Sequence, residues 1–430
     1  MHHDLNQLGL FEAARAIRAG KISSVDLVQA CLDRIAQREP ELHAWAWLDP
    51  DAALAAARKA DQQAVRGALH GIPLAVKDII DTADMPTECG SPIYRGRRPS
   101  NDAACVAMAR RNGAVVLGKT ITTEFAYFAP GPTANPRNLA HTPGGSSSGS
   151  AAAVADAQVP AAFGTQTAAS LIRPASFCGV VAYKGTLGEF SLAGIKSFAA
   201  SFDTLGVITR YVIDAQWMRW AMLGIQATEA DTQPWEGAPR IGVCHTPWWQ
   251  QADPDCQAVI EAAAQQLGRK GAKVSQATLP SHFAQLADTH KLIMAYEAAQ
   301  SLSFEHDRFP EKLSPQLLSL LEDGLKISRA RYLAAQQLAA AARHEFQAWK
   351  TDWDILLTPS AVGTAPRGLH ATGDPLFSRM WTLLGVPSVT LPGSTGQFGL
   401  PIGVQLIGDF REDDKLLAMA RWVEAKLIHD

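Results

Sequence analysis

Residues 101–120 read NDAACVAMARRNGAVVLGKT, which predicts a capped helix that ends at Gly113 and then a strand over Ala114–Leu117. The segment GIPLAVKDIID at residues 71–81 lies just upstream, and its short apolar run suits a strand better than a helix. Because this alternation of helices and strands recurs, we expect an α/β fold in which helices cover both faces of a sheet.

The rest of the chain fits one large unit with two helical regions. Residues 1–65 carry three helical patterns, and we expect these N-terminal helices to pack on a core formed by residues 66–430. Within that core we expect a mostly helical insertion at about 245–350, with a short strand near 272–278. The apolar runs after the insertion, DILLTPS, PSVTLP and PIGVQLIG, are predicted to be buried strands.

Composition excludes several classes of protein. The 430 residues include 39 basic and 42 acidic side chains with no basic run, which argues against a nucleic-acid partner. No stretch approaches about 18 uninterrupted apolar residues, so we expect no membrane partner, and the amphipathic start argues for a cytoplasmic protein. The six cysteines form no CxxC pair and the twelve histidines form no zinc-binding spacing, so we expect no metal and no cofactor.

Lys77 is the first candidate for chemistry. It lies between Val76 and the pair Ile79-Ile80, so it sits at the edge of an apolar strand. Burial disfavours the charged amine, lowers its pKa and would let a lysine act as a general base. The alternative is a strand-end lysine that reaches solvent and pairs with Asp78.

The second candidate is the loop TPGGSSSGSAAAVA at residues 142–155. Its glycines allow sharp turns that expose backbone amides, as in a phosphate-binding loop, but Ser150 stands where a Walker loop needs lysine. A literal G-x-S-x-G is centred on Ser147, which is the pattern of an α/β-hydrolase nucleophile. That elbow requires a preceding strand, and NPRNLAHTP does not form one.

The third candidate is GTQTAASLIRPASFCG at residues 164–179. A serine among small residues at the end of an apolar strand, such as Ser170, could be a nucleophile beside exposed amides that form an oxyanion hole. An ordinary turn is the alternative.

The three segments together resemble the amidase signature family, and GKTITTEFAY, LLTPS and GLPIGVQLIG are also similar to its sequences. The resemblance covers nearly the whole chain and implies a large mixed β-sheet sandwiched between helices. It also implies a Ser-cisSer-Lys triad, in which Lys77 is the base, Ser146 the bridging serine of a cis peptide and Ser170 the acyl-forming nucleophile. The further implied positions are Ser147 as an accessory partner of the lysine and the backbone amides of Thr167, Ala168, Ala169 and Ser170 as the oxyanion hole.

Two features depart from most of that family. Many members have glycine at the positions of Ala168 and Ala169, and an alanine there would be strained if its φ were positive. Arg173 follows the nucleophile by three residues rather than two, which resembles the malonamidase-like branch. In that branch the matching arginine is associated with a substrate carboxylate, and the alternative is that Arg173 braces the loop.

We therefore expect an amidohydrolase that cleaves a small or medium linear carboxylic amide, with an acid-amide such as a malonamate as one candidate. An aryl or acyl amidase with carbamate or ester hydrolysis is a second, in which apolar side chains form the acyl pocket. The expected pocket residues are Phe125, Tyr127, Phe128 and Trp381. An amidase-like protein that works only within an amidotransferase complex is the alternative of a different class, and a homodimer is left open.

Overall fold

A single mixed sheet organises the molecule. The structure is a computed structural model that describes residues 5–226, 228–233 and 235–427. Within these ranges the sheet has eleven strands: β1 (Trp45–Leu48), β2 (Pro73–Lys77), β3 (Val115–Thr120), β4 (Ala161–Gln166), β5 (Val181–Lys184), β6 (Thr204–Thr209), β7 (Arg240–Val243), β8 (Lys273–Gln276), β9 (Ile355–Pro359), β10 (Ser388–Thr395) and β11 (Pro401–Ile407). Their order across the sheet is β1-β3-β2-β4-β6-β5-β10-β11-β9-β7-β8.

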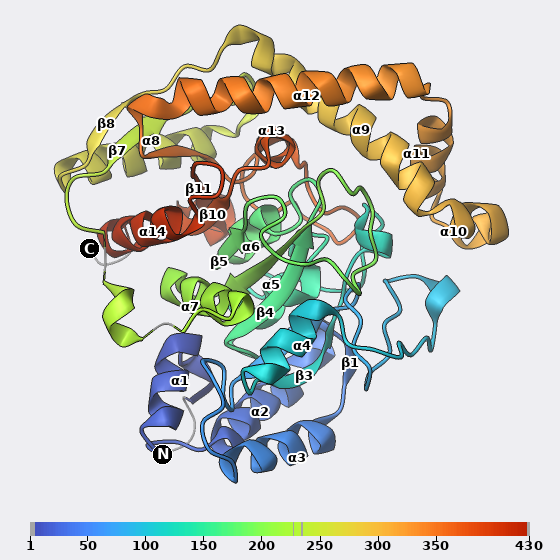
Figure 1. Cartoon of the computed structure of the whole chain (residues 1–430), viewed down its shortest axis with the longest axis vertical. Coiled ribbons are helices and arrows are strands. Elements are labelled where there is room, and N and C mark those ends of the chain that lie inside the picture. Colours follow the sequence, from blue (N-terminus) through green and yellow to red (C-terminus); the bar gives the residue numbers. More distant parts are fainter. Residues whose placement is uncertain (1–4, 227, 234, 428–430) are drawn as a thin grey trace.

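Helices surround the sheet. The described residues form α1 (Leu10–Arg18), α2 (Ser24–Leu42), α3 (Pro50–Asp61), α4 (Ala104–Arg111), α5 (Ser148–Ala155), α6 (Ile172–Cys178), α7 (Val212–Leu223), α8 (Pro254–Arg269), α9 (Leu286–Ser301), α10 (Ser303–Arg308), α11 (Pro315–Leu325), α12 (Arg329–Trp349), α13 (Leu376–Leu384) and α14 (Asp413–Leu427). Figure 1 shows α1, α2 and α3 at one end of the molecule and α9, α11 and α12 at the other. The expected α/β fold, a large mixed sheet between helices, is confirmed.

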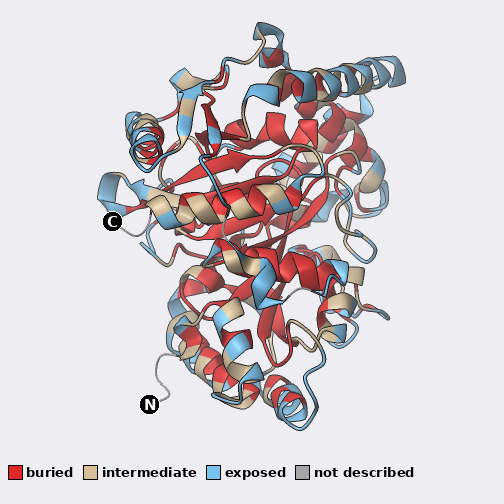
Figure 2. Ribbon diagram, turned by 60° about the vertical axis from the view of Figure 1, so that its left-hand side comes forward, coloured by how far each residue is buried: buried red, intermediate tan, exposed pale blue. Residues whose placement is uncertain are grey.

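The predicted helix and strand of residues 101–120 are present as α4 and β3, and Gly113 between them has φ +90°. Strand β2 pairs in parallel with both β3 and β4, as expected for strands joined through helices. Every residue of β2, β3, β4 and β6 is buried, so helices and loops cover both faces of the central sheet (Figure 2).

The three helices expected within residues 1–65 are present as α1, α2 and α3, but this segment also contains a strand that the sequence pattern did not indicate. Strand β1 lies between α2 and α3 and pairs antiparallel with β3, so this segment supplies an edge strand of the sheet. Its four residues, WAWL, are too few for a clear alternation of apolar and polar positions. The boundary at residue 65 stays a prediction. The expected strand near 272–278 is confirmed as β8, beside the helices of the 245–350 segment.

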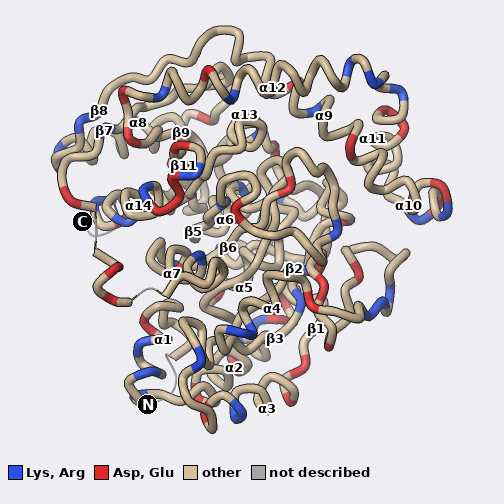
Figure 3. The backbone as a smooth tube through the Cα atoms, viewed as in Figure 1, with Lys and Arg blue, Asp and Glu red and all other residues tan. Residues whose placement is uncertain are grey.

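The outer surface carries charges of both signs. Acidic and basic residues are interspersed over the outer helices and loops rather than collected in one region (Figure 3). This distribution agrees with the formal net charge of −3.

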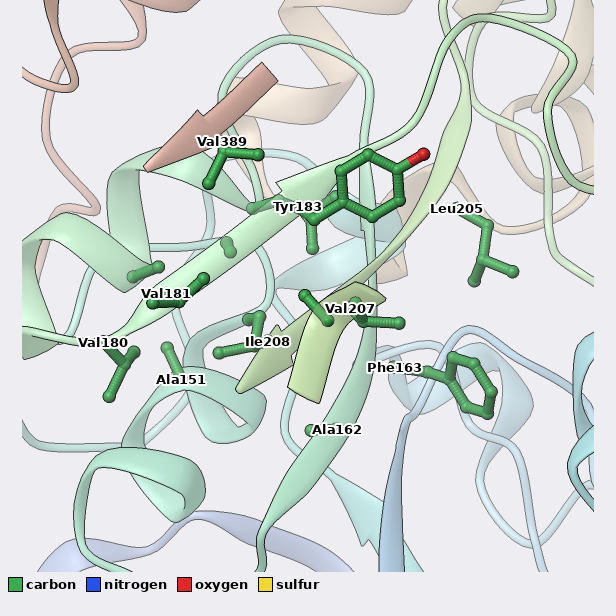
Figure 4. Close-up of a cluster of buried hydrophobic side chains, with 14 of the residues drawn as sticks. Ala151, Ala162, Phe163, Val180, Val181, Tyr183, Leu205, Val207, Ile208 and Val389 are labelled. Atoms are coloured by element: carbon green, nitrogen blue, oxygen red, sulfur yellow. The ribbon is translucent and has the colours of Figure 1, made fainter. Parts of the chain in front are cut away.

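The central strands enclose an apolar core. Phe163 of β4, Tyr183 of β5, Ile208 of β6 and Val389 of β10 have no exposed surface, and Ala151 of α5 packs with them (Figure 4). Close packing of this kind gives a rigid platform beneath the loops at the end of the sheet.

Gly149 lets helix α5 start against the sheet. Its N–H donates to the carbonyl of Ile121 at 3.0 Å. A Cβ at this position would lie 2.1 Å from the carbonyl oxygen of Ala44 and 2.5 Å from the amide nitrogen of Ile121, which no side chain can tolerate.

We predict that Gly149→Ala lowers the free energy of unfolding by at least about 3 kcal/mol or prevents folding, because the backbone must move apart. Gly268→Ala is the matched control, since Gly268 lies in α8 and its Cβ would approach no atom closer than 3.8 Å. That control should be neutral or stabilising by up to about 1 kcal/mol. Urea denaturation measures both, and equal effects would contradict the close-approach argument.

Candidate active site

The three predicted segments meet at the carboxyl ends of two neighbouring strands. Lys77 is the last residue of β2, and Ser170 follows the adjacent parallel strand β4 in the turn before α6. Ser146 lies in the loop that enters α5. Open α/β sheets place ligand sites at such strand ends, so the topology explains why residues far apart in the sequence come together.

Lys77 is completely buried. Its Nζ donates to Ser146 Oγ at 2.6 Å and to Thr165 Oγ1 at 2.8 Å. Burial lowers the pKa of Lys77 well below its ordinary value, and the charge of Asp203 opposes this shift. The alternative pairing with Asp78 is wrong, because Asp78 forms an ion pair with Lys119 at 3.3 Å.

The peptide bond between Gly145 and Ser146 is cis. Ser147 was expected to be a hydrogen-bond partner of Lys77, but its Oγ donates instead to the carbonyl of Thr165 at 3.3 Å. The hydroxyl of Thr165 occupies that role instead. Thr165 is the first threonine of the T-x-T pattern, so the sequence contained this signal.

The turn at residues 167–170 presents unpaired backbone amides. Among the described residues, the N–H groups of Thr167, Ala168, Ala169 and Ser170 have no acceptor, whereas those of the next two residues donate to Gln166 Oε1 at 3.0 and 3.2 Å. Neither alanine belongs to the described non-glycine residues with positive φ, so the strain considered for them does not arise. Converging free N–H groups suit an oxyanion.

A second layer of hydrogen bonds holds the carbonyls of this turn. His290 Nε2 lies 2.8 Å from the Thr167 carbonyl oxygen, and Thr382 Oγ1 donates to the Ala168 carbonyl at 2.8 Å. Arg379 Nη1 donates to His290 Nδ1 at 3.1 Å, so His290 must carry its proton on Nε2 and donate to Thr167. Burial lowers the pKa of His290 well below its ordinary value, which keeps the ring neutral.

A narrow inner pocket contains Ser146, Ser170 and the 167–170 turn, and Tyr127, Phe128, Arg173 and Met294 are among its other lining residues. Its volume is about 20 Å³, room for about one water molecule. Two expected pocket residues are elsewhere. Phe125 packs edge-to-face on Tyr94 at 5.9 Å between ring centroids, and Trp381 packs on Phe346 at 5.8 Å.

Arg173 is buried and its guanidinium joins two loops. Nη2 donates to the carbonyl of Gly145 at 2.7 Å and to Thr372 Oγ1 at 3.1 Å, and Nη1 donates to the carbonyl of Gly373 at 2.6 Å. Nε is buried without a partner. Burial lowers the pKa of Arg173 to about 9, with the positive charge of Arg379 as a further cause. These contacts match the bracing alternative.

In the part of the chain that the structure describes, histidine, cysteine and acidic side chains form no group suited to a metal ion. No helix of the described residues combines the length and apolar character needed to cross a membrane.

We predict that His290→Phe lowers the free energy of unfolding by about 1–3 kcal/mol, because the Thr167 carbonyl and an Arg379 N–H lose a buried partner. The phenyl ring preserves stacking on Phe202. Because the pKa of His290 is lowered in the folded protein, His290 of the unfolded chain takes up a proton first as the pH falls. The difference in free energy of unfolding between wild type and variant should therefore shrink below about pH 6.5. Urea denaturation at pH 5.5 and 7.5 tests this.

His282→Phe is the control for that variant, because His282 is exposed and bonds only to the exposed Glu345 at 2.8 Å. It should change the free energy of unfolding by less than about 0.5 kcal/mol. If His290→Phe lowered the free energy of unfolding by no more than this, the proposed stabilising role of the hydrogen bonds from His290 to Thr167 and Arg379 would be contradicted.

Comparisons with known proteins agree with this geometry. The Amidase family model matches residues 26–417. The chain is 32% identical to a subunit of the glutamyl-tRNA(Gln) amidotransferase of Acidothermus cellulolyticus, covering 98% of this chain and 95% of that one. A crystal structure of an amidase superimposes with TM-score 0.89 at 30% identity, covering 98% and 100% of the two chains. Native peptide amidase from Stenotrophomonas maltophilia gives 0.83 at 30%, covering 98% and 97%. The chain therefore belongs to the amidase signature family and is an amidase, an enzyme that cleaves amide C–N bonds.

Proposed function

We propose that this amidase hydrolyses small or medium linear carboxylic amides through an acyl-enzyme on Ser170, with Ser146 and Lys77 as a proton relay. One observation carries the proposal: the Nζ of a buried lysine lies 2.6 Å from the Oγ of a serine that shares a narrow pocket with Ser170 and with unpaired backbone amides. At this distance the neutral amine can accept the serine proton. A base, a bridging hydroxyl, a nucleophile and an oxyanion site are the parts that acyl transfer requires.

The first half-reaction forms the acyl-enzyme. Ser170 Oγ attacks the amide carbonyl and gives its proton to Ser146 Oγ, while Ser146 gives its own proton to neutral Lys77. Ser170 makes no hydrogen bond to Ser146 in the described residues, so the two hydroxyls must approach when substrate binds. The free N–H groups of residues 167–170 receive the negative oxygen. When the C–N bond breaks, the relay returns a proton to the departing amine.

The second half-reaction releases the acid. A water molecule attacks the Ser170 ester carbonyl and gives a proton to Ser146, which again passes its own to Lys77. Collapse of this intermediate breaks the bond to Ser170 Oγ, which regains a proton from the relay. The products are a carboxylic acid and an amine or ammonia, and atoms and protons balance without a further reactant.

We assign Arg173 to bracing rather than to substrate binding. Three of its N–H groups are already used by the carbonyls of Gly145 and Gly373 and by Thr372, so few donors remain for a substrate carboxylate. The contact with Gly145 fixes the residue that precedes Ser146.

The curated relatives favour a second candidate, an amidase-type chain that works within an amidotransferase complex. Relatives at 32–34% identity over 98–99% of this chain are named as one subunit of glutamyl-tRNA(Gln) amidotransferase. Amidotransferase subunits typically carry a TDTGGS-like sequence at this turn, whereas residues 165–170 of this chain read TQTAAS. This difference favours an independent amidase. Gel filtration of the isolated chain, with ammonia release from amide, ester and carbamate panels, distinguishes the two and also reports a homodimer.

We predict that a fluorophosphonate labels Ser170 and that Ser170→Ala removes the label and lowers turnover at least about 10³-fold. Peptide mapping by mass spectrometry locates the label, and ammonia release measures turnover. Ser147→Ala is the comparison variant and should still be labelled at Ser170. A label on Ser147 in the wild type would instead support the α/β-hydrolase alternative.

We predict that kcat/KM rises with pH through an acid limb set by Lys77, because only the neutral amine accepts a proton. Burial lowers the pKa of Lys77, so this limb should lie well below pH 10. Lys77→Arg should be inactive, since guanidinium cannot deprotonate. Lys119→Arg, at the buried lysine paired with Asp78, should keep the wild-type pH profile. An active Lys77→Arg enzyme would refute the relay.

A further inference from the structure

A second cavity adjoins the inner pocket and shares Phe128 and Pro375 with it. This cavity, here called the vestibule, has a volume of about 540 Å³, whereas the inner pocket holds about 20 Å³. Ligand sites commonly measure about 300–1,000 Å³. A substrate whose reacting carbonyl fills the inner pocket must extend beyond it, and the vestibule offers adjoining space.

Four charged residues line the vestibule, and three of them are already engaged. Lys291 pairs with Asp288 at 2.9 Å, and Asp374 accepts the backbone N–H of Leu376 at 2.9 Å. The fourth, Arg379, forms no ion pair with any carboxylate of the described residues. The negative charges of Asp374 and Asp288 oppose the lowering of the Arg379 pKa by burial, but neither carboxylate is hydrogen-bonded to the guanidinium. A nearly buried guanidinium whose edge is not used by a carboxylate of the described residues is an attractive place for an anionic group.

The guanidinium of Arg379 leaves one edge free. Nη1 donates to His290 Nδ1 at 3.1 Å, while Nε and Nη2 donate to no described residue. Neither nitrogen is fully buried, and Arg379 lines the vestibule, although the residue as a whole is only 6% exposed. Nε and Nη2 form the side of the guanidinium that binds a carboxylate with two parallel hydrogen bonds.

Arg173 offers no such edge. Arg173 lines the inner pocket, but both of its terminal nitrogens are hydrogen-bonded to the protein and its Nε is buried. Arg173 therefore holds the loops of the inner pocket, whereas Arg379 lines the larger vestibule.

We propose that Arg379 binds the carboxylate of a linear amide that carries one, and thereby selects acid-amides over neutral amides. The inference rests on the proposed function, because it takes the amide carbonyl to lie at Ser170. The substrate class is a monoamide of a dicarboxylic acid, with its amide in the inner pocket and its carboxylate in the vestibule.

The test compares malonamate, succinamate and glutaramate with isosteric neutral amides in which an isopropyl group replaces the carboxylate. Arg379→Gln keeps an N–H donor for His290 but removes the charge and the paired edge. For the acid-amide that the wild type prefers, this variant should raise KM about 10- to 100-fold, and KM for its neutral partner should change less than about 3-fold. Calorimetric titration with glutarate should show at least about 10-fold weaker binding to the variant.

Two variants separate binding from positioning. His290→Phe breaks the link to the 167–170 turn while keeping the Arg379 charge, so it should lower kcat equally for both members of a pair. Lys326→Gln removes an exposed cation outside the vestibule, one that pairs with Asp323 at 2.9 Å, and should change KM less than about 2-fold.

Equal losses of Arg379→Gln on acidic and neutral amides, or unchanged glutarate binding, would overturn the proposal. If the wild type cleaves none of the six amides but glutarate binding still depends on Arg379, the proposed function fails while the carboxylate site stands. If the wild type cleaves neutral amides and Arg379→Gln changes nothing, only the carboxylate site is wrong.

Discussion

The hydrogen bond from Lys77 to Ser146 depends on keeping an amine out of water, and the rest of the site is arranged around that constraint. Lys77 ends a strand that has neighbours on both sides and no exposed surface, so its neutral form is favoured. Successive residues of an extended chain point to opposite sides, which explains why Asp78 neutralises Lys119 and leaves Lys77 without a carboxylate partner.

Much of the fold and the chemical centre could be predicted from the sequence. The alternation around Gly113 gave α4 and β3, and the apolar runs after residue 350 gave β9, β10 and β11, because each element has a local signal. Lys77, Ser146 and Ser170 meet as the family resemblance implies. Their catalytic roles are proposed from this placement.

Other parts of the site have no local signal. His290 comes from α9 and Arg379 from α13, and each acts on a turn more than one hundred residues earlier. The sequence also did not indicate which of the expected aromatic residues point into the pocket. Positive φ angles at Phe125 and Ala126 turn the chain, so Phe125 enters the core while Tyr127 faces the pocket. On a helix, positions two apart point to different sides, so Trp381 is in the core although Arg379 lines the vestibule.

The bracing contacts of Arg173 have a consequence for biosynthesis. This residue connects the loop before Ser146 to Thr372 and Gly373, so the site needs a segment that the ribosome delivers only after most of the chain has been made. The sheet also depends on a late segment of the chain, because β10 pairs with β5 although some two hundred residues separate them. Contacts of such long sequence separation form late in folding. A nascent or truncated chain that ends before Thr372 therefore holds Lys77, Ser146 and Ser170 but lacks both the bracing contacts of Arg173 and strand β10. We expect such a chain to be inactive, so that the amidase becomes competent only when synthesis is nearly complete.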